Sequence, residues 1–85
     1  MPFYVYMLKS ISNIKVKTYV GYTKDLKKRL DKHNLNKGAK STKGYKWVLI
    51  YKKKFINKSK AMSYEYILKK NKKKRKTLLK DYLIR

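Results

Sequence analysis

The length and the composition of this chain limit the number of its domains and the kind of partner that it can bind. Eighty-five residues form one domain with a thin core, so we expect residues 1–85 to be a single domain in which one surface carries the function. The 26 Lys and Arg residues against 4 Asp and Glu give a net charge of +22, which self-repels unless a polyanion such as nucleic acid binds it. Codon bias in an AT-rich genome and anionic lipid are competing explanations, but codon bias should also enrich Glu, and Glu65 is the sole glutamate.

Missing residue types exclude several kinds of site. The chain has no Cys, and His33 is its one histidine, which excludes disulfides, a thiolate nucleophile, sulfur-bound zinc and a multi-His metal cluster. A metal would have to be a hard cation bound by oxygen, mostly of water and substrate phosphate, as Mg²⁺ commonly is. The apolar runs fall far short of the ~20 residues of a membrane span, and no basic segment precedes the first run. We therefore expect an intracellular protein, in the cytoplasm or on the nucleoid.

The first half of the chain predicts a hairpin followed by a helix. Residues 3–9 and 16–22 have strand chemistry and should pair as an antiparallel hairpin. A helix should follow from about residue 24 to 35, with Thr23 as its N-cap and residues 36–38 as its C-cap.

The second half predicts one more strand and two helices. Residues 47–56 form the strand, and Asn57 or Ser59 caps a helix that runs to about Lys70. The last helix has one apolar stripe, formed by Leu78, Leu79, Tyr82 and Leu83. Between these helices, residues 69–76 are almost wholly basic, which is most often typical of a solvated face. The fold class is therefore α/β (α+β), a small sandwich with a three-stranded sheet.

Two residues of the first helix do not suit an apolar face. Leu26 and Leu30 define its buried stripe, and Arg29 and His33 lie on the same face. Charged side chains are rarely buried unless they are paired, because removing water from a charge costs several kcal/mol or more. A functional site is one explanation. Equally open is a structural one, in which Arg29 extends past the core and His33 closes the helix.

Glu65 stands out in the second helix. Its spacing from Ala61, Met62 and Leu68 places it on the apolar stripe. A carboxylate there is either a metal ligand or half of a buried ion pair, with Arg29 or a neighbouring Lys as its partner. The pattern leaves both interpretations open.

Tyrosines and a glycine mark the hairpin. Tyr4 and Tyr6 lie on one face of the first strand, and pairing can bring Tyr19 of the second strand beside them. For most of the nine tyrosines a place in the core is a sufficient explanation. Gly21 is more specific, because glycine inside a strand usually marks a bulge or a place where a ligand approaches the backbone.

Together these residues resemble a known family across nearly the whole chain. The similarity to the GIY-YIG nuclease superfamily is carried by Tyr4-Val5-Tyr6, Tyr19-Val20-Gly21, Arg29, His33-Asn34 and Glu65. It is nearest to the small stand-alone UvrC/YhbQ-like members and extends to the nuclease half of Slx-type structure-selective endonucleases. Tyr4 replaces the glycine of the first motif and Val20 the isoleucine of the second, while both catalytic-position tyrosines remain.

The resemblance implies a three-stranded antiparallel sheet flanked by helices and a metal-dependent DNA endonuclease. By similarity, Glu65 holds one Mg²⁺ or Mn²⁺ that binds the scissile phosphate. Tyr6 or Tyr19 orients or deprotonates the attacking water. Arg29 neutralises charge on the phosphoryl group, and His33 assists as a proton handler or phosphate contact.

The expected partner is DNA, branched or nicked, cut by structure in repair or recombination, and an additional protein partner is left open. Side chains expected to bind its backbone are Lys24, Lys37, Lys40, Lys43, Lys46, Lys69, Lys72 and Lys73. The alternative is a non-catalytic basic module that binds DNA or RNA, which the charge alone would explain.

Overall fold

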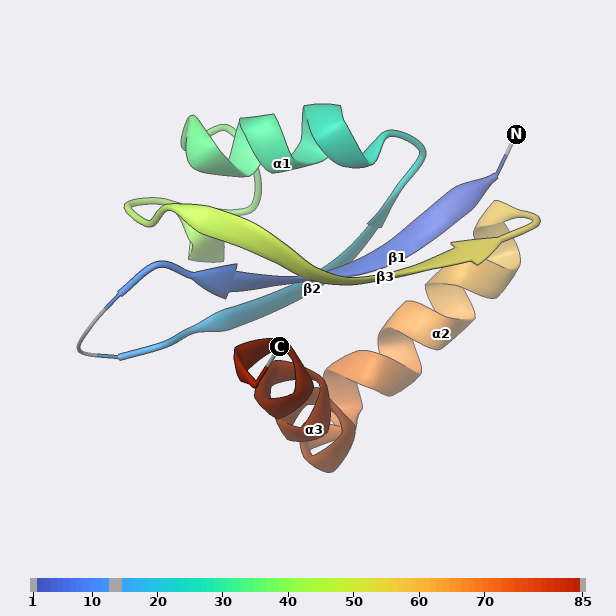
Figure 1. The fold of residues 1–85 in the computed structure, drawn as a ribbon. Helices are drawn as coiled ribbons and strands as arrows, with labels where there is room; N and C mark the ends of the chain where they lie inside the picture. Colours follow the sequence, from blue (N-terminus) through green and yellow to red (C-terminus); the bar gives the residue numbers. More distant parts are fainter. Residues whose placement is uncertain (1, 13–14, 85) are drawn as a thin grey trace.

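Three strands pair into one antiparallel sheet, and three helices cover its two faces (Figure 1). The structure is a computed structural model that describes residues 2–12 and 15–84. The elements in chain order are β1 (Phe3–Ser10), β2 (Thr18–Thr23), α1 (Leu26–Asn34), the 3-10 helix η1 (Lys40–Thr42), β3 (Trp47–Phe55), α2 (Lys58–Lys70) and α3 (Lys72–Leu83). Strand order is β2-β1-β3 with both pairings antiparallel, so the predicted fold class and element order are confirmed.

The central strand β1 divides the core into two layers. Alternate side chains of a strand point to opposite faces. Val5 and Met7 pack in the layer formed with α2 and α3, whereas Tyr6 and Leu8 pack with Trp47 and residues of α1 in the other. Figure 1 shows α1 on one side of the sheet and α2 and α3 on the opposite side. No helix among the described residues is long and apolar enough to span a membrane.

The caps of α1 differ from those predicted. Thr23 does not cap the helix, because it is still part of β2, where it pairs with Tyr4. Asp25 is the N-cap, and its carboxylate accepts a hydrogen bond from the Lys28 backbone N–H at 3.1 Å. At the other end Leu35, not the segment 36–38, is the C-cap, and Asn36 follows in the left-handed conformation with φ 62°.

The sequence predicted that the basic run, residues 69–76, lies between two helices. In the structure the run instead belongs to the helices themselves. A single residue, Asn71, ends α2 and also caps α3, so Lys69 and Lys70 close α2 and residues 72–76 open α3. Asn57, the first of the two predicted candidates, caps α2. The predicted stripe of α3 is one residue too long, because Leu83 is 57% exposed while its other three members pack on the core.

Strand β3 forms one edge of the sheet. Its register against β1 shifts between Met7 and Leu8, so that Ile50 is an additional residue without a partner in the register. Beyond this bulge Lys52, Lys53 and Lys54 are exposed, although the strand stays paired with β1 and its last residue, Phe55, packs on the core.

The cap assignment is directly testable. Replacing Asp25 by Ala should lower the free energy of unfolding by about 1 kcal/mol, because a helix N–H loses its acceptor. Asp31→Ala removes the same charge from an exposed position of α1 and should change stability by less than about 0.5 kcal/mol. Urea unfolding followed by circular dichroism measures both, and an equal loss in the two variants would contradict the assignment.

Candidate active site

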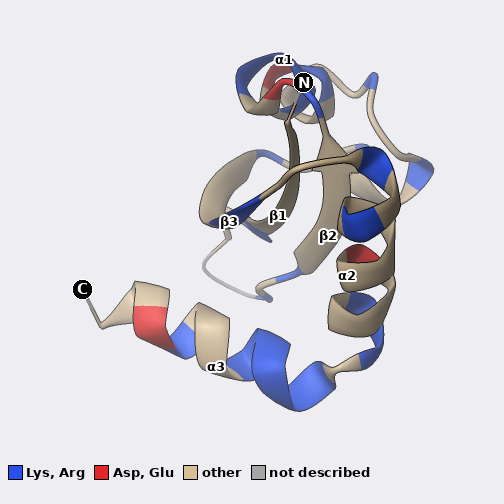
Figure 2. Ribbon diagram, turned by 90° about the vertical axis from the view of Figure 1, so that its right-hand side faces the viewer, with Lys and Arg blue, Asp and Glu red and all other residues tan. Residues whose placement is uncertain are grey.

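A pocket of about 390 Å³ opens at the β2 edge of the sheet. Figure 2 shows α2 alongside β2, with the acidic segment of α2 facing the strand. The pocket is lined by Tyr6, Tyr19, Gly21, Tyr22, Thr23, Arg29 and Glu65. Four of the five predicted catalytic residues therefore meet there, and the fifth, His33, is buried directly behind Tyr6.

Gly21 is what lets Tyr6 reach this pocket. The β1–β2 register places the two residues opposite each other. A Cβ atom on residue 21 would lie 2.5 Å from the Tyr6 hydroxyl oxygen and 3.1 Å from the Tyr19 ring. The glycine of the second motif is thus a site of close approach, but what approaches the backbone is the Tyr6 side chain and not the ligand that the sequence suggested.

A chain of hydrogen bonds runs from the pocket into the core. Tyr6 Oη lies 2.9 Å from His33 Nε2, and His33 Nδ1 lies 2.9 Å from Thr42 Oγ1. The Thr42 hydroxyl donates its single hydrogen to the Ala39 carbonyl at 2.8 Å. His33 Nδ1–H must therefore donate to Thr42. Burial lowers the pKa of His33 and favours the neutral ring, whose Nε2 then accepts the Tyr6 hydroxyl hydrogen.

The loop after α1 supports His33 through Thr42 and Gly38, to which the sequence assigned no role at the site. Thr42 is fully buried, and a Cβ on Gly38 would collide with the His33 ring. Asn34 bonds the backbone of Trp47 twice, accepting from its N–H at 2.6 Å and donating to its carbonyl at 3.1 Å. Short polar residues and a glycine close to a buried histidine are the signal that could have identified this support.

Burial sets the protonation states of the buried pair. Desolvation raises the pKa of Tyr6 to about 12, although the hydrogen bond from Arg29 opposes it. Desolvation, and then the charge of Arg29, lower the pKa of His33. Arg29 Nε donates to the Tyr6 hydroxyl at 3.3 Å, and this bond is the main reason that the pKa of Arg29 is raised. Tyr6 and His33 are accordingly both neutral at pH 7, beside a permanent cation.

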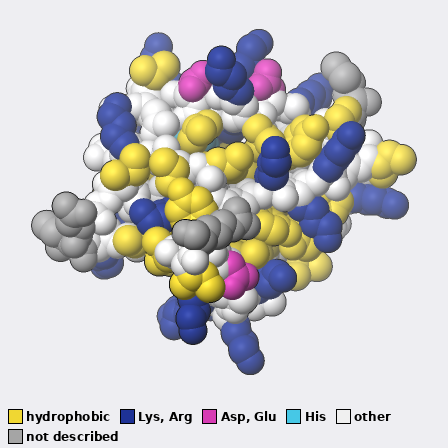
Figure 3. All heavy atoms as spheres, in the orientation of Figure 1, with side chains coloured by type: hydrophobic (Ala, Val, Ile, Leu, Met, Phe, Trp, Pro, Cys, Tyr) yellow, Lys and Arg dark blue, Asp and Glu magenta, His cyan; other side chains and the backbone are white. Residues whose placement is uncertain are grey.

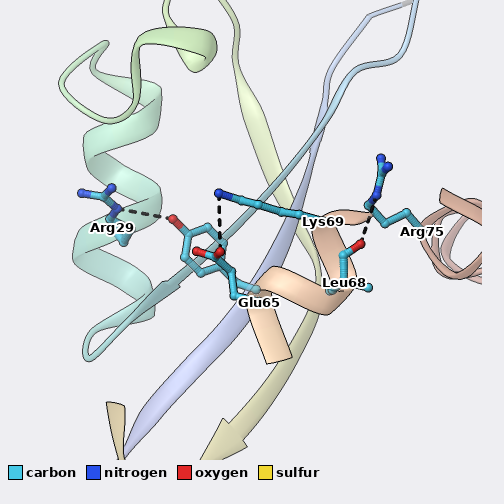
Figure 4. A network of polar contacts seen from close by, with 6 residues as sticks. Arg29, Glu65, Leu68, Lys69 and Arg75 are labelled. Atoms are coloured by element: carbon cyan, nitrogen blue, oxygen red, sulfur yellow. Dashed lines mark hydrogen bonds and ion pairs between the residues drawn. The ribbon is translucent and has the colours of Figure 1, made fainter. Parts of the chain in front are cut away.

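Glu65 is paired with a lysine. The Lys69 ammonium lies 3.5 Å from the Glu65 carboxylate, whose side chain is 16% exposed. Of the two partner types that the sequence left open, the described structure therefore has the neighbouring Lys, and Arg29 bonds Tyr6 instead. Figure 4 shows Arg29 on α1, to one side of Glu65 and Lys69 of α2, with a dashed line between Lys69 and Glu65.

Tyr19 forms the wall between these groups. Its ring centroid is 4.9 Å from that of His33 and 6.3 Å from that of Tyr6. The Lys69 ammonium lies 5.9 Å from the centroid of the same ring. Tyr19 thus contacts the buried pair on one side and a cation on the other.

The carboxylate of Glu65 fits one class of metal. Within residues 2–12 and 15–84 no group of three or more His, Asp or Glu side chains could hold a metal ion. A single carboxylate at the wall of an open pocket fits a hard cation that keeps most of its water and binds substrate phosphate, as Mg²⁺ does.

The lysines expected to bind nucleic acid all have exposed side chains. They are Lys24, Lys37, Lys40, Lys43, Lys46, Lys69, Lys72 and Lys73. Lys and Arg side chains project from the face and the outline seen in Figure 3, and in Figure 2 most of the first half of the α3 ribbon has the colour of Lys and Arg. Three of the eight have another contact. Lys69 pairs with Glu65, Lys46 Nζ donates to the Asn34 carbonyl at 3.0 Å, and the Lys24 ammonium lies 5.6 Å from the centroid of the Phe3 ring.

Because His33 is the single histidine, its burial should be visible in the pH dependence of stability. Its folded-state pKa lies below the unfolded value of about 6.5, so the unfolded chain binds the proton more readily. The contribution of His33 to stability is therefore complete above about pH 6.5 and is lost as the pH falls below it.

Urea unfolding between pH 8 and 5 tests this. The wild type should lose stability below about pH 6.5, and His33→Gln, although less stable overall, should lack that loss. A stability that stays constant from pH 8 to 5 would show that His33 is not held in its neutral form.

Known proteins are similar to this chain in sequence and in fold. Residues 2–78 match the model of the GIY-YIG catalytic domain. A UPF0213 protein of Oceanobacillus iheyensis is 46% identical over 67 residues, covering 78% of this chain and 74% of that protein, and one of Staphylococcus haemolyticus is 43% identical over 78% of both. The solution NMR structure of a UPF0213 protein from Bacillus halodurans superposes with a TM-score of 0.52 at 34% identity, covering 94% of this chain and 84% of that one. The chain therefore belongs to the GIY-YIG family and carries its nuclease domain.

Proposed function

We propose that this protein is a metal-dependent DNA endonuclease whose active site is the pocket between Tyr6 and Glu65. The observation that carries the proposal is the convergence of a tyrosine with a hydrogen-bonded histidine, an arginine and a carboxylate on one pocket. Membership of the GIY-YIG family supports a nuclease, and the net charge of +22 supports a polyanionic substrate.

Tyr6 is the better candidate to receive a proton from the attacking water. With a pKa of about 12 it is not ionised in advance, so its own proton has to leave as it takes one up. His33 Nε2 is the acceptor of the Tyr6 hydroxyl hydrogen, which gives that proton a destination. A water hydrogen would pass to the Tyr6 oxygen while the Tyr6 hydrogen passes to His33. Tyr19, beside both rings, would hold them in place.

Arg29 and Glu65 would handle charge. Arg29 remains cationic beside the Tyr6 oxygen and can neutralise the negative charge that develops on the phosphoryl group. Glu65 would hold Mg²⁺ or Mn²⁺, exchanging its lysine partner for the metal. A divalent ion bound there would supply stabilisation of charge on the scissile phosphate and on the leaving 3′ oxygen.

We propose branched or nicked DNA as the substrate, with a role in repair or recombination. The exposed lysines contact the backbone in a way that is independent of sequence, and we find no additional base-reading element among the described residues. The protein would then choose its cleavage site by the structure of the DNA and not by its base sequence. Binding should be strongly dependent on salt.

A second candidate function is a nucleic-acid-binding module without turnover. The observation that favours it is the ion pair between Lys69 and Glu65, which already neutralises the carboxylate. Under this alternative Glu65 serves to orient Lys69 toward the nucleic acid, and divalent metal has no effect on binding.

Glu65→Gln separates the two functions. Labelled nicked duplex, flap and four-way-junction DNA should be cut by the wild type in Mg²⁺ or Mn²⁺ and not in chelator. Glu65→Gln should reduce the cleavage rate by about 100-fold or more while DNA binding persists. Asp31→Asn, an exposed carboxylate on α1, is the matched control and should cut normally. Absence of cleavage by the wild type on every substrate, with binding intact, would support the binding module.

Tyr6→Phe tests the assignment of the proton acceptor. Loss of the hydroxyl should reduce cleavage by about 10²- to 10⁴-fold, because general base catalysis is removed, with little change in DNA affinity. Tyr19→Phe should reduce the cleavage rate less than Tyr6→Phe does. Tyr66→Phe, at an exposed position of α2, should leave the cleavage rate unchanged. A larger defect in Tyr19→Phe than in Tyr6→Phe would assign the water to Tyr19.

A further inference from the structure

A second pocket, of about 370 Å³, lies on the other side of Tyr19. Its lining residues are Thr18, Tyr19, Val20, Ser41, Lys69 and Arg75, so that β2, η1, α2 and α3 each contribute. Tyr19 lines both pockets. Lys69 also connects them, because its ammonium lies 3.5 Å from Glu65 at the first pocket while the side chain lines the second.

The lining of the second pocket is suited to an anion. It combines two cations with the hydroxyl groups of Thr18 and Ser41, and the described residues that line it include no Asp or Glu. Hydroxyl and cationic donors together are the side chains that bind phosphate oxygens.

Arg75 is held in place for such a role. Its Nε donates to the Leu68 carbonyl at 3.2 Å, which anchors the guanidinium at the α2–α3 junction. That bond uses one of the five N–H donors of the guanidinium. The other four, on the two terminal nitrogens, are the donors that can bind a phosphate. Figure 4 shows Arg75 beyond Lys69, on the opposite side from Arg29.

We propose that the second pocket binds a backbone phosphate of the same nucleic-acid strand whose scissile phosphate enters the first. The proposal depends on the proposed function for the identity of the ligand. A strand that passes over Tyr19 meets Arg29 and Glu65 on one side of the ring and Arg75 on the other. Two held phosphates fix the position of the strand along its own axis, which a single contact cannot do. Arg75, Thr18 and Ser41 then determine which phosphodiester bond lies at Tyr6.

The test measures binding in chelator, so that it does not require cleavage. Anisotropy of a labelled 12-base-pair nicked duplex, titrated at several salt concentrations, gives the affinity and its salt dependence. Arg75→Gln should weaken binding by about tenfold and reduce the slope of log K against log[salt] by about one. Lys80→Gln, an exposed residue of α3, removes the same charge away from the pocket and should leave both nearly unchanged.

Two further variants separate a phosphate site from general charge. Arg75→Lys keeps the charge and loses the planar fork, so it should keep the salt slope and still lose affinity. Thr18→Val with Ser41→Ala changes no charge and should weaken binding several-fold, whereas Ser59→Ala with Ser63→Ala, two exposed hydroxyls of α2, should not. Thermal unfolding of each variant verifies that it is folded.

Equal effects of Arg75→Gln and Lys80→Gln, or unchanged binding after removal of both pocket hydroxyls, would overturn the proposal. The two failures are distinguishable. If the variants change binding as expected but the protein cuts no DNA, the proposed nuclease function is refuted and the phosphate pocket is supported. If cleavage depends on Glu65 but binding does not depend on Arg75, the nuclease function is supported and the phosphate pocket is refuted.

Discussion

The hydrogen bond between Tyr6 and His33 joins the central strand to the helix that covers it, and the site is organised around this bond. Both side chains are at most 1% exposed, so the hydrogen bond between them is shielded from bulk water. An unpaired polar group at such a position costs about 1–3 kcal/mol, and the chain through Thr42 to the Ala39 carbonyl leaves none unpaired. The residues closest to the chemistry are thus also core residues of an 85-residue protein.

This arrangement couples reactivity to packing. The burial that fixes Tyr6 also raises its pKa to about 12, and the same burial lowers the pKa of His33. Each shift keeps its group neutral, so in the proposed mechanism neither Tyr6 nor His33 is ionised before substrate and metal bring charge to the pocket. Arg29 is the one cation that the described structure holds against the Tyr6 hydroxyl, and a metal at Glu65 would add the rest.

The sequence predicted those features that show as a mismatch between a residue and its place in a pattern. Arg29 and His33 on a buried stripe, Glu65 on an apolar face and Gly21 within a strand are all such mismatches, and all four lie at the pocket or directly behind it. The order of elements followed from the alternation of strand and helix signals.

Features that depend on tertiary contact could not be found in the same way. Gly38, Thr42 and Arg75 are ordinary residues of a polar loop and a basic run until folding brings them against His33, Tyr19 and Leu68. Asp25 displaced Thr23 as the helix cap because pairing with β1 extends β2 through Thr23, and strand pairing is not visible in local sequence. The sequence could not decide between Arg29 and a lysine as the partner of Glu65, because the choice depends on a tertiary contact. Arg29 donates its hydrogen bond to Tyr6, and Glu65 pairs with Lys69.

The exposed edge of β3 has a consequence for how the molecule behaves when no nucleic acid is near. The unpaired N–H and C=O groups of an edge strand can pair with a strand of another chain, and repeated pairing of this kind leads to aggregation and fibres. Here the bulge at Ile50 interrupts the regular spacing of the edge, and Lys52 to Lys54 would face the lysines of any identical chain that docked on it. The same surplus of positive charge that attracts DNA therefore also keeps copies of the protein from templating one another.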